Sequence, residues 1–401
     1  MAKNSNGKLK MKNSKWLTPN LILLTLVSFT QDAASDLLYP LLPILLTGVI
    51  GAAPIALGLI EGCAEAAAGF TKLWAGNKSD YLGRKPFVVA GYGLAGIGKA
   101  LVVVATAWPL VFFGRVTDRI GKGMRSTPRD ALIHDSVPNE HLGKAFGFHR
   151  AGDNFGAVVG PLLAVAGLWL LDGDVRKVAQ WALIPALLSG LLTFLIKDKY
   201  VKKIKVAKEK RMKVLLPSPL KRSIGILVLI QLTNIPDALL LLRLHDIGLS
   251  TTMVVLAYAF ANLIATFAAY PAGVIADKFS PQVVYLFGLI TFAIAYCTLG
   301  LTQNHHLAFL MLGLYGFFGA LTDGVGKSWI ARMSQPEHRG RAQGVYQASM
   351  NFAILGAGIW GGLLWSRGTH ELPLVLAGIG AALGAAYFAF DLIGKRFAHR
   401  N

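Results

Sequence analysis

The sequence predicts an all-α membrane protein with twelve transmembrane helices arranged as two homologous six-helix bundles. The first observation is composition: 54% of the 401 residues are hydrophobic and 15% are charged, against about 25% charged in soluble domains. The second is a repeat, because two motifs at 76–85 and 136–147 recur at 273–280 and 334–344. Both recur at about half the chain length, which indicates an internal duplication.

Apolar segments of about 20 residues are long enough to cross a ~30 Å hydrocarbon core. In lipid such segments should be helices, because a helix satisfies its backbone hydrogen bonds internally. The predicted spans are 20–47, 53–75, 86–107, 109–128, 146–171, 178–196, 223–243, 251–272, 282–301, 306–330, 343–366 and 372–393.

The net charge of +19 is concentrated at one side of these spans. Residues 197–222 alone hold eleven Lys and Arg, and the tail before the first span is also basic. This positive-inside pattern predicts that both termini are cytoplasmic. It divides the chain into an N-terminal bundle (1–196), a basic cytoplasmic linker (197–222) and a C-terminal bundle (223–401). The linker has Tyr200 as its only aromatic residue, so we expect contact with anionic lipid and not with nucleic acid.

The first repeated motif reads Gly-x-x-x-Asp-x-x-Gly-Arg-Lys. Asp80 and Arg84 are four residues apart and can pair on a helical turn, and Gly76 and Gly83 permit a tight turn and close backbone approach. With the span count, the duplication and the basic linker, this loop resembles the signature of the major facilitator superfamily over about residues 15–396. The resemblance implies a monomer that works by alternating access around a central cavity, with this loop as a gate.

Two further segments are assigned to gating. In the second copy of the loop, Gly273 and Asp277 match the first copy, whereas Ser and Pro replace its Gly-Arg pair. In the fifth span, Gly156-x-x-x-Gly160-Pro161 has the small-residue spacing that lets helices approach closely. The resemblance associates this second motif with antiporters.

Charged side chains inside spanning helices cost several kcal/mol and usually mark a pathway or coupling site. With a rise of ~1.5 Å per residue, acids of the first two spans and bases of the third and fourth reach one level. We expect these acids and bases to neutralise each other there. The intramembrane charges of the N-terminal half are Asp32, Asp36, Glu61, Glu65, Lys99, Arg115, Asp118, Arg119 and Lys122.

Three interpretations of this layer remain open. In the first, buried acids take and release a proton as access alternates, through Asp32, Asp36, Glu61 and Glu65 with Arg115 and Asp118. In the second, Lys99, Arg115 and Arg119 bind an anionic substrate directly. In the third, the charges form a fixed network that holds the bundle together. By analogy with the family, helices 1, 4, 7 and 10 line the cavity, which adds Asn234, Asp237 and Tyr315 as candidate substrate contacts.

The fourth span also resembles the family's helix-4 motif, in which an Arg at the position of Arg115 is linked to proton movement. Its extra charges are similar to those of a poorly characterised prokaryotic branch. We therefore expect a proton-coupled secondary active transporter of a small solute in the plasma (inner) membrane, with export by antiport favoured. Uptake of an anionic solute, such as a carboxylate siderophore or metal chelate, is one alternative, and a non-transporting receptor is another. The sequence offers no sign of an enzyme, a metal site or a cofactor.

Overall fold

A computed structural model describes residues 17–138, 141–198, 216–335 and 339–398, and within these ranges every regular element is helical. A few helical side chains, among them those of Asp80 and Asp277, lie outside the described set. The helices group into twelve rods in the predicted order, so the predicted all-α architecture is confirmed. Nine rods are single helices: α3 (Pro54–Leu82), α4 (Lys85–Val104), α5 (Trp108–Ser136), α6 (Leu142–Leu170), α11 (Thr251–Lys278), α12 (Pro281–Leu301), α13 (His305–Arg332), α14 (Arg339–Ser366) and α15 (Leu372–Ala398).

The other rods are composite. The first changes helix type where prolines remove backbone donors near its end, and the seventh is interrupted between two helices. They consist of α1 (Pro19–Leu38) with η1 (Tyr39–Leu41), α2 (Leu42–Ile44) and η2 (Leu45–Val49); α7 (Val175–Trp181) with α8 (Leu183–Thr193); and α9 (Ser218–Gln231) with α10 (Asp237–Asp246). The helix α9 thus begins inside the predicted linker, and most of that linker, 199–215, lies outside the described residues.

In the described part of the chain, nine helical stretches are long and apolar enough to span a membrane by composition alone. The rods that fall short are α3, α5 and the pair α9 and α10. The first two carry the intramembrane charges predicted for spans 2 and 4, which lower their hydropathy, and the third is interrupted. The rods that carry intramembrane charges or a helix interruption are therefore among those in which the sequence predicted functional residues.

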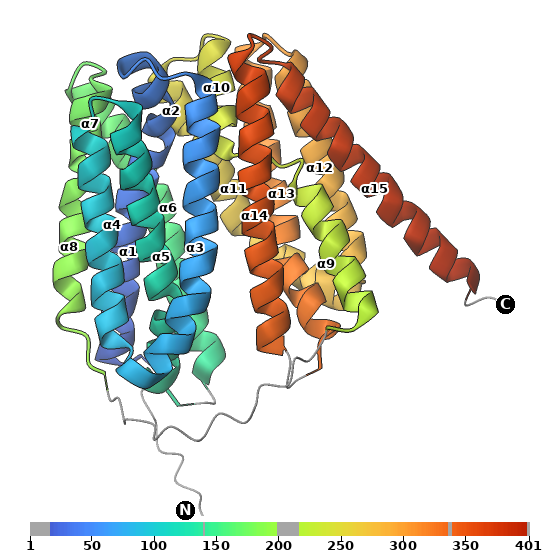
Figure 1. Cartoon of the computed structure of the whole chain (residues 1–401), viewed down its shortest axis with the longest axis horizontal. Helices are drawn as coiled ribbons and strands as arrows, with labels where there is room; N and C mark the ends of the chain where they lie inside the picture. Colours follow the sequence, from blue (N-terminus) through green and yellow to red (C-terminus); the bar gives the residue numbers. More distant parts are fainter. Residues whose placement is uncertain (1–16, 139–140, 199–215, 336–338, 399–401) are drawn as a thin grey trace, which may run out of the picture.

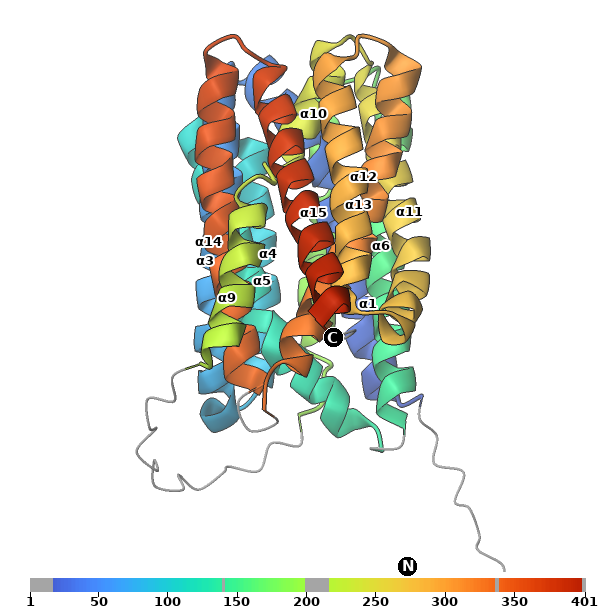
Figure 2. The same cartoon turned by 90° about the vertical axis from the view of Figure 1, so that its right-hand side faces the viewer.

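The two halves stand side by side, with α1 to α8 in one and α9 to α15 in the other (Figure 1). They meet along two seams, α3 against α14 and α6 against α11, which Figure 2 places at opposite edges. At the first seam the helix backbones touch: a side chain at Gly58 would collide with the carbonyl of Gly358, and the reverse is also true. This contact requires glycine on both helices.

We term the end of the bundle that carries the α3–α4 turn and the start of α1 the basic end, and the opposite one the far end. At the turn Gly83 has φ +91°, a left-handed conformation that favours glycine, as its predicted turning role requires. Arg84 donates to the Ala131 carbonyl at 2.9 Å and pairs with Asp135, so the turn is tied to α5. The predicted pairing of Arg84 with Asp80 involves a side chain outside the described set.

The glycine motif of the fifth span packs α6 closely on α1. A side chain at Gly156 would meet the Phe29 carbonyl, and one at Gly160 would meet the Ala33 carbonyl. Pro161 follows directly, inside the helix. The close helix approach predicted from the small-residue spacing is confirmed.

Replacing Gly160 by alanine should destabilise the N-terminal half, although alanine is the better helix former. The added methyl overpacks the contact with α1, and overpacking typically costs about 1–3 kcal/mol. The thermal unfolding midpoint of the purified protein should therefore fall. Gly190→Ala on α8 is the matched control, because no atom lies within 4 Å of the position that an added Cβ would occupy there. Equal midpoints for the two variants would contradict the packing argument.

Candidate functional site

A cavity of about 460 Å³ lies between the two halves, which is ample for a small metabolite. Its wall in the N-terminal half is highly charged, whereas the C-terminal half contributes mostly polar and apolar groups. The lining residues are Asp32, Ser35, Asp36, Tyr39, Glu61, Glu65, Arg115, Arg119, Lys122, Arg125, Ser126, Arg129, Asp153, Gln231, Asn234, Ile235, Pro236, Asp237, Tyr258 and Ile354.

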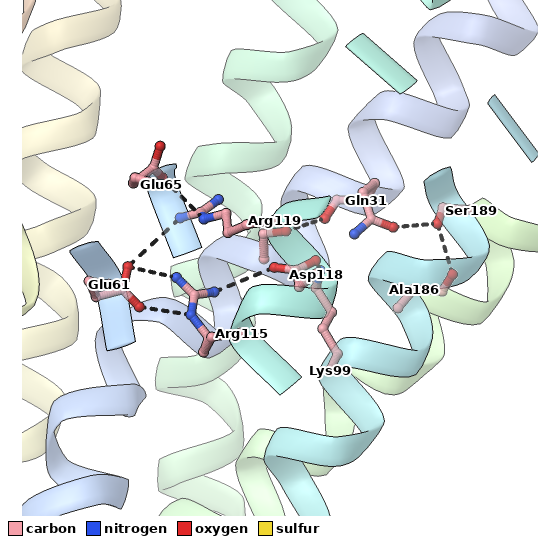
Figure 3. A network of polar contacts seen from close by, with 10 residues as sticks. Gln31, Glu61, Glu65, Lys99, Arg115, Asp118, Arg119, Ala186 and Ser189 are labelled. Atoms are coloured by element: carbon pink, nitrogen blue, oxygen red, sulfur yellow. Dashed lines mark hydrogen bonds and ion pairs between the residues drawn. The ribbon is translucent and has the colours of Figure 1, made fainter. Parts of the chain in front are cut away.

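The strongest contact in the wall joins Glu61 on α3 to Arg115 on α5. Arg115 Nε donates to Glu61 Oε1 at 2.8 Å and Nη2 donates to Oε2 at 2.9 Å (Figure 3). Both residues are 2% exposed. A bidentate, charge-assisted pair of this kind is among the strongest hydrogen-bonded arrangements in proteins. It also neutralises both charges where water is scarce.

Behind this pair a second acid closes the network. Lys99 Nζ on α4 donates to Asp118 Oδ1 at 2.8 Å, and Arg115 Nη1 reaches Asp118 Oδ2 at 3.4 Å (Figure 3). Lys99 and Asp118 are both buried, and neither is among the residues that line the cavity. Lys99 and Arg115 lie at a common level, as predicted, because both contact Asp118. Lys99 pairs with Asp118, however, and does not line the cavity.

One turn nearer the basic end, Arg119 continues the network. Its Nε lies 3.1 Å from Glu65 Oε1, and its Nη2 lies 4.0 Å from Glu61 Oε2. The guanidinium of Arg115 also lies over the ring of Tyr39, 5.5 Å from the ring centroid. Both arginines predicted to contact substrate are therefore already held by acids of α3.

Two acids of α1 have a different environment. Asp36 Oδ1 accepts a hydrogen bond of 2.7 Å from the Tyr258 hydroxyl, which belongs to α11 in the other half. The Tyr258 ring also packs against Tyr39, with centroids 5.5 Å apart. Asp32 lines the cavity one turn nearer the basic end. Among the described residues, no cation forms an ion pair with either acid. These aspartates are therefore chemically unlike Glu61 and Glu65.

The C-terminal half presents the interruption between α9 and α10 to the cavity, at the position where Pro236 predicted a break. Asp237 is the first residue of α10 and accepts a 2.7 Å hydrogen bond from the Tyr315 hydroxyl. Asn234 Oδ1 accepts from the hydroxyls of Tyr296 at 3.2 Å and Tyr315 at 3.4 Å. The three predicted substrate contacts of this half thus form one cluster, in which Tyr315 supports the two cavity-lining residues.

A family model described as the Major Facilitator Superfamily matches residues 24–242 and 223–396, which together cover most of the chain. The chain belongs to the Major Facilitator Superfamily. It is therefore a multi-pass membrane transporter of small molecules and not an enzyme, as the sequence predicted.

Relatives and solved structures agree with this assignment. An uncharacterized MFS-type transporter of Methanocaldococcus jannaschii is 28% identical, over 88% of this chain and 90% of the relative. A multidrug resistance protein, MdtH, of Cronobacter sakazakii is 24% identical over 85% and 86%. The nucleoside transporter NupG shares the fold with a TM-score of 0.73 at 12% identity, covering 92% of this chain and 98% of that one. A D-xylose-proton symporter gives 0.68 at 17% identity, covering 92% and 96%.

Sequence reasoning missed part of this facilitator's site. The predicted fourth span ended at residue 128, but α5 passes through Pro128 and continues to Ser136. Arg129 therefore extends the charged stripe of α5 along the cavity wall, next to Arg125, which lay inside the predicted span but was not assigned to the site. The three- and four-residue spacing of the basic residues continues beyond the proline, and this spacing was the signal that could have identified them.

Proposed function

We propose that this facilitator is a proton-coupled secondary active transporter of a small solute, with export by antiport favoured, in the plasma membrane. In this proposal the basic end and both termini face the cytoplasm, in accord with the positive-inside distribution. The glycine motif that packs α6 on α1 resembles one that the family associates with antiporters, and this resemblance supports antiport. The relatives described as multidrug resistance proteins support export.

The observation that carries the proposal is the contact between Asp36 and Tyr258. The contact joins the two halves across the cavity wall, and the Asp36 carboxyl group has no cation partner among the described residues. A proton can therefore neutralise Asp36, whereas Glu61 is already neutralised by Arg115. Because protonation changes the acceptor in a contact between halves, it can bias the equilibrium between the two access states.

The remaining charges have supporting roles in this proposal. Glu65 and Arg119, with the pair formed by Glu61 and Arg115, hold α3 and α5 in register beside the titrating group. Lys99 and Asp118 fix α4 against α5. Asp32 and Asp237 also line the cavity without an ion pair to a described cation, so they are further candidate proton sites. A cationic solute would compete with the proton for these acids, which is the requirement for antiport.

The test reconstitutes the purified protein in liposomes that contain a pH-sensitive dye and imposes a proton gradient. The solutes are cationic drugs, sugars, amino acids and citrate-type chelates with and without iron. We expect at least one solute to move protons through the wild type, and Asp36→Asn to reduce this movement to that of protein-free liposomes. Asp246→Asn is the control, because Asp246 lies at the far end beside His370. Proton movement that persists in Asp36→Asn would reject the assignment of Asp36.

The direction of the solute gradient that produces proton movement distinguishes export from uptake of an anionic solute. Solute binding without any proton movement across the whole panel would instead favour a facilitator without coupling or a receptor.

A further inference from the structure

The cations on the cavity side of α5 fall into two sets. In the first set, Arg115 and Arg119 are held by the glutamates of α3, and Arg129 pairs with Asp130 at 3.2 Å and with Asp153 at 3.7 Å. Lys122 and Arg125 lie between these arginines along α5 and line the same cavity. In the described part of the chain, neither forms an ion pair or a side-chain hydrogen bond. The second set therefore has charge that no acid of the described chain neutralises by direct contact.

Arg125 is the more unusual of the two. It is 4% exposed, and its Nη1 is buried without a hydrogen-bond partner among the described residues. Buried polar groups are normally hydrogen-bonded, and a buried guanidinium without an acceptor is costly. Its orientation is nevertheless held, because the guanidinium lies 4.6 Å from the Tyr92 ring centroid. The Tyr92 hydroxyl is in turn hydrogen-bonded to Ser28 at 2.8 Å.

Lys122 is one turn away on the same helix and, unlike Arg125, is exposed to the cavity. Residues three apart on a helix are neighbours, so its ammonium group can reach the same ligand as Arg125. The glycines on either side of Lys122 allow α5 to pack closely on its neighbours. A side chain at Gly121 would meet the Gly91 carbonyl, and one at Gly123 would meet the Ala68 carbonyl. This packing holds the backbone at Lys122 in place while its side chain faces the cavity.

We propose that Lys122 and Arg125 bind an anionic group, a carboxylate or a phosphate, of the transported solute. The proposal rests on the proposed transport function and refines its substrate class. Guanidinium and ammonium groups are the usual partners of such oxyanions. Arg129 lines the cavity farther toward the basic end but is paired with two aspartates, so among the described residues Lys122 and Arg125 carry the unpaired positive charge of this wall. The rest of the solute, which carries the cationic group that competes with the proton, then faces Asp36 and Asp237.

The experiment measures binding to the full-length protein in lipid nanodiscs, without a proton gradient. Sodium phosphate and sodium acetate are titrated separately against sodium chloride at constant ionic strength, and the thermal unfolding midpoint gives an apparent Kd. We expect a saturable rise for at least one anion. Lys122→Gln and Arg125→Gln should each weaken the affinity by about tenfold or more, as expected for loss of a charge-assisted hydrogen bond. Response to phosphate alone indicates phosphate esters, and response to acetate alone indicates carboxylates.

The controls keep or remove charge elsewhere. Lys122→Arg and Arg125→Lys should retain most of the affinity, and Lys177→Gln, which changes an exposed side chain of α7 at the far end, should leave it unchanged. If Arg125→Gln does not fold, Lys122→Gln decides the result, because the Lys122 side chain is exposed. A saturable shift for neither anion, or one that both glutamine variants leave unaltered, overturns the proposal. Proton movement without anion binding would reject this subsite alone, and anion binding without proton movement would reject the coupling alone.

Discussion

Replacing Glu61 by glutamine should lower the free energy of unfolding by about 3–5 kcal/mol, the typical cost of removing one partner of a buried ion pair. Glutamine preserves the shape of the side chain but not its charge. Arg115 then remains at membrane depth with only Asp118, 3.4 Å away and shared with Lys99, as its counter-charge. The measurement is the thermal unfolding midpoint of the purified protein in one fixed detergent.

A double variant, and a second pair whose acid is exposed, make this result specific. In Glu61→Gln with Arg115→Gln both charges are gone, so most of the lost stability should return. Glu371→Gln is the matched control, because Glu371 pairs with Arg243 but its side chain is 49% exposed. Arg243 also keeps the carbonyls of Leu299 and Gly300 as acceptors. A similar, small effect of Glu61→Gln and Glu371→Gln would show that the buried pair does not carry this stability.

The second large effect is expected from Gly58→Val at the seam between the halves. The backbones of α3 and α14 touch at Gly58 and Gly358, so a branched side chain forces the two helices apart. We expect this contact, together with the packing of Tyr39 on Tyr258, to close the far end of the cavity. We expect the transport rate to fall at least about tenfold, because alternating access requires this closed arrangement.

Cysteine labelling checks the structural reason for this loss. Ser35 lines the cavity, so Ser35→Cys is introduced after Cys63 and Cys297 are replaced by serine. A membrane-impermeant maleimide added from the far side should label it faster when Gly58→Val is present. Gly96→Val is the matched control, since a Cβ added at Gly96 would have no atom within 4 Å. Unchanged labelling in Gly58→Val would contradict the view that this contact closes the far end.

Local features of the fold were predictable because they depend on short stretches of sequence. Apolar length indicated the helices, and glycine spacing indicated the close packing of α6 on α1. Pro236 indicated the break before α10. The exception is the end of α5: the predicted span stopped at Pro128, whereas the helix continues to Ser136. A proline removes one donor and strains one turn, and the packing of α5 between α3 and α4 outweighs this cost.

The sequence by itself determined that most of the intramembrane charges lie in the N-terminal half and that several share one depth, since the rise per residue converts position into height. It did not determine which charges meet. Whether Lys99 reaches Asp118 or a cavity-facing acid depends on how each helix is rotated about its axis. The rotation of α1 likewise decides that Asp36 contacts Tyr258 of the other half. Only the packing of helices distant in sequence sets these rotations, so the tertiary structure alone decided which groups are neutralised and which remain available to a proton or a solute.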